Sequence, residues 1–367
     1  MGRSGHSHEQ ESFPMKEISR RQFLVFTTAA GLVGTVSSLP RTALASSATA
    51  SGYVFTADEL GNSISRIDLR SGRVEIARVA ITPHNVQYVA AGNHLLAVGM
   101  PASSMDGHSG DSHASNPQTG RLIVLDADDL VSGKAISVDI GAHPAHVVAD
   151  REGARAFATN SGDNTVSVID LATASVIKSI STGDYPHGLR MSPDGTIVCI
   201  ANVNDGSVSV VDTATLSEVD RISVGVAPVQ VGFTPDGAHL YVSLRDENRV
   251  GVIDTATRKV IGYIDVGRSP IQLHATPDGR FVYVANQGTE AEPDDKVSVI
   301  DIAKARVVQT IRTGKGAHGV AVSADGSFVF ITSIVDGTVS LIDVASQSVT
   351  ASYKVGDGPN GITYRAK

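Results

Sequence analysis

A unit of about 42 residues recurs along most of the chain, and this repeat limits the possible folds more than any other feature. An apolar stretch that ends in Asp, such as Val166–Asp170, returns at intervals of 42 to 58 residues. The residues that end these stretches are Asp68, Asp126, Asp170, Asp212, Asp254, Asp301 and Asp343. Short apolar segments separated by turns at this period are typical of β-propeller blades.

A second marker, usually Pro, precedes another short apolar stretch in each unit. The markers are Pro83, Pro144, Pro186, Pro228, Pro270, Ala317 and Pro359. Between marker and Asp lie a turn, as in Ser192–Gly195, and an apolar run, as in Phe281–Asn286. Each unit therefore predicts four short strands joined by turns, called strands A to D here. The repeated Asp residues are expected to bond the backbone of the turn between strands C and D.

The two ends of the repeat region complement each other. The last unit supplies only a strand A, at Gly361–Tyr364, while Tyr53–Thr56, Ile64–Asp68 and Val74–Ala80 supply the missing strands B, C and D. A lone four-stranded sheet exposes two apolar faces, and ring closure buries both of them. The sequence thus predicts an all-β fold, a single seven-bladed β-propeller over residues 52–367, with its last blade closed by strands from both termini.

The residue pattern of the repeat resembles that of a known family. The succession P-x-G-x-x-x-S-P-D-G, then Y-V-A-N as at Tyr283–Asn286, then V-S-V-I-D, is similar to the YVTN-type propeller repeats of the YncE-like group. The resemblance covers about residues 50–367. It implies the propeller fold and an exported protein, and it leaves the activity open because propellers host binding, enzymatic and scaffold roles.

Composition excludes several classes of protein. The chain is 41% hydrophobic and contains one Cys, which excludes a disordered chain, a disulfide scaffold and a cysteine-ligated metal cluster. The net charge of −8 argues against general nucleic-acid binding, although the YncE-like resemblance raises single-stranded DNA as a ligand. No nucleotide-binding fingerprint, P-loop, nucleophile elbow or HExxH motif occurs, so no nucleotide cofactor is indicated.

The first 45 residues have the pattern of an export signal. Arg20 and Arg21 precede a moderately apolar run from Val25 to Leu39, and the small-residue site Ala43–Ala45 follows. This order predicts a twin-arginine signal peptide over residues 1–45, a short linker over 46–51, and a periplasmic or secreted mature protein. The apolar run is too short for a membrane span, so none is expected in the mature form.

Sorting the loops by face concentrates the histidines. Loops between strands D and A share one face with loops between strands B and C. The longest B–C insertion runs from Met100 to Gly120, and a smaller acidic one spans Gln287 to Asp295. Seven of the ten histidines outside the signal peptide map to this face: His84, His108, His113, His143, His146, His187 and His318. His274 is placed instead within a strand A, level with Arg190 of another blade.

Histidines gathered from several blades around one axis predict a transition-metal site. His84, His146, His187 and His318 form the core candidate set, and the long insertion could add His108 or His113. Imidazole is a common ligand for copper and zinc, and Met100 and Met105 in or beside the same insertion favour copper. The hypothesis is therefore an exported binding protein that holds copper or zinc.

Three alternatives remain open. The Pro-His-Gly spacing suits a tight turn whose imidazole bonds a backbone carbonyl, and a wide mouth would keep His84 and His187 apart. In the second alternative the protein is a propeller hydrolase or lyase that acts on a small organic substrate, although the sequence does not single out a set of catalytic residues. In the third it is a scaffold that binds a protein partner on the same face. We expect a monomer in each case.

Overall fold

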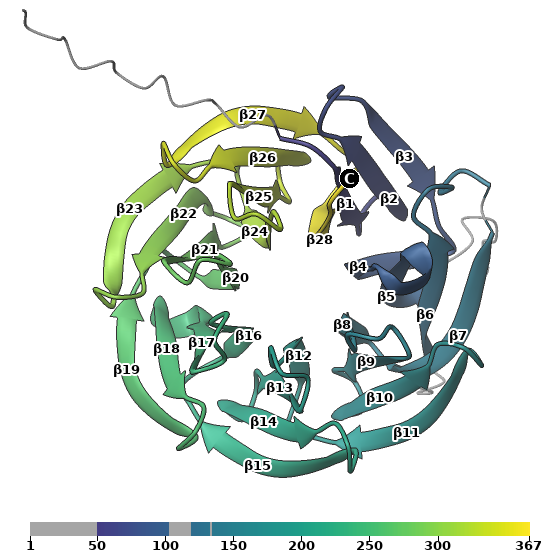
Figure 1. Cartoon of the computed structure of the whole chain (residues 1–367), viewed down its shortest axis with the longest axis horizontal. Helices are drawn as coiled ribbons and strands as arrows, with labels where there is room; N and C mark the ends of the chain where they lie inside the picture. Colours follow the sequence, from purple (N-terminus) through teal and green to yellow (C-terminus); the bar gives the residue numbers. More distant parts are fainter. Residues whose placement is uncertain (1–49, 103–118, 133) are drawn as a thin grey trace, which may run out of the picture. The chain divides into compact units, whose positions relative to one another are not determined.

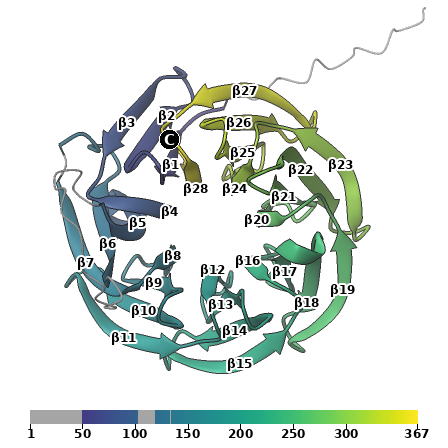
Figure 2. The ribbon, with the colours of Figure 1, turned by 180° about the vertical axis from the view of Figure 1, so that it is seen from behind.

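Seven four-stranded antiparallel sheets form a ring around a central channel (Figures 1 and 2). The computed structural model describes residues 50–102, 119–132 and 134–367. Each sheet runs from a strand beside the channel to a strand at the outer rim, so the predicted seven-bladed, all-β propeller with four strands per blade is confirmed. Within these described residues no helix is long and apolar enough to span a membrane.

Strands A line the channel and strands B follow them outward (Figure 1). Strands A are β4 (Ile81–Val89), β8 (Pro144–Ala149), β12 (Pro186–Met191), β16 (Pro228–Phe233), β20 (Pro270–Ala275), β24 (Ala317–Val322) and β28 (Pro359–Arg365). Strands B are β1 (Tyr53–Asp58), β5 (His94–Pro101), β9 (Arg155–Asn160), β13 (Ile197–Asn202), β17 (His239–Leu244), β21 (Phe281–Gly288) and β25 (Phe328–Ser333).

Strands C and D complete each blade toward the rim. Strands C are β2 (Ser63–Asp68), β6 (Thr119–Asp126), β10 (Thr165–Asp170), β14 (Ser207–Asp212), β18 (Arg249–Asp254), β22 (Pro293–Asp301) and β26 (Thr338–Asp343). Strands D are β3 (Val74–Arg78), β7 (Ala135–Ala142), β11 (Ser175–Ser181), β15 (Ser217–Ser223), β19 (Lys259–Asp265), β23 (Arg306–Arg312) and β27 (Ser348–Lys354). Two short 3₁₀ turns, η1 (Ala91–Asn93) and η2 (Arg245–Glu247), lie in the connections.

Both termini of the propeller meet in one blade, as the sequence predicts. Strand β28 pairs antiparallel with β1, so that Val54 lies opposite Tyr364 in the strand order β28-β1-β2-β3. The core continues across the blade boundary, because Val54 packs in one buried cluster with Phe330 of the preceding blade. Burial of each large apolar side chain contributes about 1.5–3 kcal/mol. Closure is therefore held by backbone pairing within the blade and by apolar packing between blades.

A tight turn delivers each strand A to the same end of the channel. Strand A begins at the predicted marker in six of the seven blades. The residue before the marker has a positive φ of 48° to 71° in those blades: His143, Tyr185, Ala227, Ser269, Gly316 and Gly358. This left-handed conformation reverses the chain between the rim strand D and the channel. The first residues of strand A consequently lie at the same end of the channel in these blades.

Candidate metal centre

Three of the predicted histidines meet at the start of three successive strands A. His84 lies on β4, His146 on β8 and His187 on β12, which are neighbours around the channel (Figure 1). One ligand nitrogen from each residue lies within 4.8 Å of the other two. The imidazole centroids are 4.9 to 5.7 Å apart. The alternative in which a wide mouth separates His84 from His187 is wrong, because their Nε2 atoms are 3.3 Å apart.

Hydrogen bonds on the other ring nitrogen orient two of these imidazoles. His187 Nδ1 lies 3.2 Å from the carbonyl oxygen of Val229, and His84 Nδ1 lies 3.1 Å from Glu59 Oε1. A carbonyl and a carboxylate only accept, so Nδ1 is the donor in both residues. Both Nε2 atoms therefore face each other with a lone pair when the rings are neutral. The predicted turn-type contact to a carbonyl does occur at His187, and it leaves Nε2 free for a ligand.

The third histidine is fully buried and incompletely bonded. His146 is 0% exposed, and its Nε2 has no hydrogen-bond partner among the described residues. Its Nδ1 lies 3.4 Å from Nε2 of Gln230, a residue of the strand A two blades away. A buried polar nitrogen without a partner destabilises the fold, and such an atom calls for an explanation. A ligand at the mouth would supply the missing interaction.

Burial keeps two of the three imidazoles, those of His146 and His187, neutral at neutral pH. Burial lowers the pKa of His187 to about 3, with further lowering by charge on His84. Burial and the neighbouring His187 and His84 hold the pKa of His146 well below its usual range. A neutral imidazole has the lone pair that a metal ion requires, whereas a protonated one repels a cation. His146 and His187 can therefore bind a cation without first losing a proton.

One acidic residue that the sequence analysis missed completes the site. Glu59, in the turn between β1 and β2, accepts hydrogen bonds from His84 Nδ1 and from Asn360 Nδ2 at 2.6 Å. Burial would raise the pKa of Glu59, but the bonds from His84 and Asn360 outweigh it and lower the pKa to about 2. Glu59 lies in a B–C turn, so the face rule that located the histidines would also have found it.

A strand B hydroxyl fixes the backbone beneath the imidazoles. Thr159 Oγ1 accepts a hydrogen bond from the backbone N–H of His146 at 2.9 Å and donates one to the carbonyl oxygen of His187 at 2.7 Å. Ser243 and Thr332 make the same pair of bonds in other blades. This bridge is thus part of the repeat, and at β9 it sets the spacing of two candidate ligands.

The mouth also contains a small cavity with a thioether. A cavity of about 220 Å³ is lined by His84, His187, Glu59, His143 and Met100, among others. Met100 lies near the end of β5, where the long insertion begins. The cavity therefore combines imidazole nitrogens, one carboxylate and one sulfur within reach of a single small ligand.

Of the remaining predicted ligands, the structure describes only His318, which is not part of the group of three. His318 on β24 is 5% exposed and its Nδ1 lacks a partner among the described residues, but it is not part of the cluster. It follows the marker at the start of β24, and burial and charge on His84 lower its pKa to about 3. His108, His113 and Met105 lie outside the described residues.

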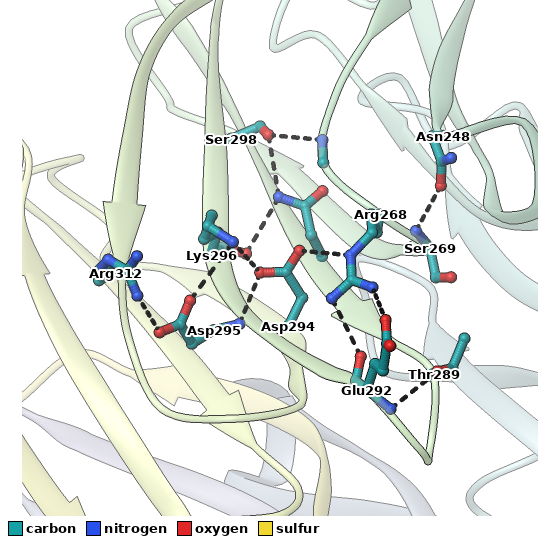
Figure 3. Close-up of polar contacts among 12 residues, drawn as sticks. Asn248, Arg268, Ser269, Thr289, Glu292, Asp294, Asp295, Lys296, Ser298 and Arg312 are labelled. Carbon is teal, nitrogen blue, oxygen red and sulfur yellow. Dashed lines mark hydrogen bonds and ion pairs between the residues drawn. The ribbon is translucent and has the colours of Figure 1, made fainter.

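The second insertion is occupied by ion pairs. Arg268 Nη1, from the turn between β19 and β20, bonds Glu292 of the β21–β22 hairpin at 2.9 Å, and Lys296 Nζ bonds Asp294 within the hairpin at 2.9 Å (Figure 3). Arg312 Nη1 pairs with Asp295 at 2.6 Å. These carboxylates are neutralised by cations of their own neighbourhood, so they stabilise the hairpin and are not a free acidic ligand set.

Two family models match parts of the chain. Residues 133–243 match the YNCE-like beta-propeller, and residues 236–355 match the cytochrome D1 heme domain. The first match, together with the seven-bladed fold, confirms the predicted YncE-like resemblance. No curated protein matches the chain in sequence.

Solved structures share the fold at low sequence identity. Hydrazine synthase of Kuenenia stuttgartiensis is 21% identical with a TM-score of 0.63, covering 77% of this chain and 89% of that chain. A putative 6-phosphogluconolactonase from Bacteroides uniformis is 16% identical with a TM-score of 0.67, covering 86% and 99%. A functionally unknown protein from Desulfotomaculum acetoxidans is 14% identical with a TM-score of 0.68, covering 86% and 99%. At these identities the likeness establishes the propeller fold alone.

Proposed function

We propose that this chain, a YncE-like β-propeller, is a binding protein that holds one copper or zinc ion between His84, His146 and His187. The observation that carries the proposal is the convergence of three imidazole nitrogens from three blades within 4.8 Å. Glu59 would orient His84 through Nδ1, the arrangement in which a carboxylate fixes a metal-binding imidazole.

The spacing of the two Nε2 atoms supports this function. Four nitrogens at about 2.0–2.1 Å from a tetrahedral zinc ion are separated by roughly 3.3 Å. His84 Nε2 and His187 Nε2 are 3.3 Å apart. Because both Nδ1 atoms are donors, two neutral rings would place lone pair against lone pair at that distance. A cation between them, either a proton or a metal ion, removes the repulsion.

The ligand types favour copper over zinc. Met100 lines the same cavity as His84 and His187. Thioether sulfur is a soft ligand that selects Cu(I), whereas zinc sites in proteins are built from imidazole, thiolate and carboxylate. Met100 is therefore the proposed fourth ligand for copper, and zinc would take three imidazoles and an oxygen.

A tetrapyrrole fits this mouth poorly. The match to a heme domain covers residues 236–355, which excludes all three clustered histidines. The cavity beside them measures about 220 Å³. Sites for drug-sized ligands are about 300–1,000 Å³, and a tetrapyrrole is at the large end of that class. No haem chemistry is therefore derived for these residues.

Elemental analysis tests the proposal directly. Mature protein, purified without an affinity tag or added metal, should carry close to one equivalent of copper or zinc. The variant H84A/H146A/H187A should carry none, whereas H94A/H239A, which removes two histidines from the opposite face, should keep the full content. Thermal unfolding of each variant checks that it folds. Metal-free protein that also takes up neither ion on titration would overturn the proposal.

A thioether variant separates the two metals. Met100→Leu keeps the volume of the side chain and removes the sulfur. It should weaken Cu(I) binding, measured by competition with a chromogenic chelator, by about tenfold and leave Zn(II) binding unchanged. Equal affinities for Cu(I) in the two proteins would remove Met100 from the site.

We also propose that the protein functions outside the cytoplasm. The support is the order of Arg20 and Arg21, an apolar run and Ala43–Ala45 in the sequence. R20K/R21K should hold the protein in the cytoplasmic fraction, while R41K should be exported like the parent chain. Export of the R20K/R21K variant at the parental level would contradict the twin-arginine route.

A further inference from the structure

A second pair of polar side chains lies at the other end of the channel. Arg190 on β12 and His274 on β20 occupy the same position in their strands A, four residues after the marker, near the A–B turns. Between them β16 contributes Gly232, which has no side chain. These residues line a cavity of about 260 Å³ that is separate from the histidine cluster. The proposed metal site does not use any of them.

The guanidinium of Arg190 has no counter-ion within the part of the chain that the structure describes. Its Nη1 donates to the carbonyl oxygen of Leu189 at 3.0 Å, and no carboxylate among residues 50–102, 119–132 and 134–367 forms an ion pair with it. By contrast, Arg155 on the neighbouring strand B, β9, pairs with Asp150 at 3.2 Å. Burial lowers the pKa of Arg190 to about 10, so it stays charged at neutral pH. A partly buried charge without a partner is costly, and an anion would relieve the cost.

His274 adds a neutral polar group to the same cavity. Its Nδ1 lies 2.8 Å from the carbonyl oxygen of Ala275, which only accepts, so Nδ1 carries the proton. Burial, and then the charge of Arg190, lower the pKa of His274 to about 4. The cavity thus offers one full positive charge and one neutral imidazole. A doubly charged anion such as phosphate would leave one negative charge unpaired.

The rest of the lining is apolar except for Thr234, whose hydroxyl is bonded to Asp236, and it limits the size of the ligand. Met191, Phe233 and the prolines of three A–B turns form the walls. Sites for drug-sized ligands start at about 300 Å³, so this cavity suits a smaller molecule. A planar guanidinium binds a carboxylate through two parallel hydrogen bonds. We propose that this end of the channel binds a small monocarboxylate whose charged group pairs with Arg190 and whose apolar body packs against Met191 and Phe233.

Calorimetric titration of the full chain with phenylacetate tests this site. Phenylacetate should bind measurably, phenylacetamide, which has the same shape without the charge, should bind at least tenfold more weakly, and inorganic phosphate should bind more weakly than phenylacetate. Arg190→Met should lose at least tenfold in affinity, while Arg121→Met, which removes a partly exposed arginine from β6 in another blade, should not. Absence of phenylacetate binding, equal binding of the amide, tighter binding of phosphate or an unchanged R190M variant would each overturn the proposal.

A measurement on the unaltered protein covers the case in which R190M fails to fold. The imidazole C–H resonance of His274, assigned by its loss in His274→Phe, should shift when phenylacetate is added and should stay in place when phenylacetamide is added. A resonance that does not move with phenylacetate would overturn the site. This readout is independent of metal at the histidine mouth, so either proposal can fail alone.

Discussion

The outer rim and the channel mouth of this propeller differ in whether the seven blades carry the same residue at equivalent positions. At the rim, the residue that ends strand C is Asp in all seven blades, and each Asp accepts a backbone N–H from the following turn. At the mouth, the first two residues after the strand A marker differ from blade to blade, and among the described residues three successive blades bring histidines together. The Asp that recurs in every blade stabilises a turn of its own blade. The histidines, which occur in only some blades, form a site that is shared between blades.

Removal of one mouth histidine should have the largest effect. His187→Ala deletes a proposed ligand whose orientation is fixed by the Val229 carbonyl. We expect metal affinity to fall about a hundredfold or more, because even residues that only orient a ligand contribute 10–100-fold. His239→Ala on the opposite face should leave affinity unchanged. A fall of equal size in both variants would show that the effect is on the fold and not on the site.

Removal of the orienting charge should have a smaller effect. Glu59→Gln keeps an acceptor for His84 Nδ1 but loses the negative charge. We expect metal affinity to fall about 10–100-fold with little change in unfolding temperature. Glu292→Gln, which alters an acid on the same face that pairs with Arg268, is the matched control. Unchanged affinity in E59Q would restrict Glu59 to holding Asn360.

The closing blade offers a test that depends on pH. At the end of strand B, Asn160, Asn202 and Asn286 bond hydroxyls of strand C, and the closing blade has Asp58 in this place, bonded to Ser65 at 2.6 Å. Burial raises the pKa of Asp58 from 3.8 to about 6, although the serine and threonine hydroxyls oppose it. The folded protein therefore binds this proton more tightly than the unfolded chain.

The sign of the effect follows from that difference. The free energy of unfolding falls as pH rises from 3.8 to about 6. Above this range the folded protein holds the charged carboxylate of Asp58 in a buried position, whereas the unfolded chain exposes it to water. Asp58→Asn should therefore raise the free energy of unfolding by about 1–2 kcal/mol at about pH 7.5 and have little effect at about pH 4. Denaturant unfolding at the two pH values measures it. An equal gain in the free energy of unfolding at the two pH values would show that the effect does not come from the charge of Asp58.

A change at the rim should have the smallest effect. Asp212 Oδ1 accepts the backbone N–H groups of Ala214 and Thr215 at 3.0 and 2.7 Å in an exposed turn. Asp212→Ala should lower the unfolding temperature slightly and leave metal binding unchanged. Loss of metal in D212A would mean that the rim and the mouth are coupled, contrary to the comparison above.

Periodicity alone was enough to predict the fold. Turn chemistry and alternating apolar residues act within one blade, and seven copies in register leave a ring as the arrangement that buries both faces of each sheet. The role of Asp68 and its six counterparts followed from the same local logic. Even the pairing of β28 with β1 could be predicted from the sequence, because the last unit lacks three strands and the N-terminal region supplies three.

The distances at the mouth were decided by the tertiary structure. The sequence placed His84, His146, His187 and His318 on one face, yet only the first three have nitrogens within 4.8 Å of one another. Their separation depends on the positive φ of His143 and Tyr185 before two of the markers, on the Thr159 bridge between strands and on the radius of the channel. These are properties of packed blades, which no local pattern encodes.

The difference between the two has a physical reason. Each repeat is stabilised by short-range interactions, namely turns, alternation along strands and hydrogen bonds within a blade. The sequence by itself therefore determined the seven-bladed ring and the face on which each loop lies. Glu59 and Asn360 meet His84, and Arg190 shares a cavity with His274, only after residues from opposite ends or from separate blades of the chain are brought to one axis. The tertiary structure alone decided those meetings, because closing the ring sets their distances.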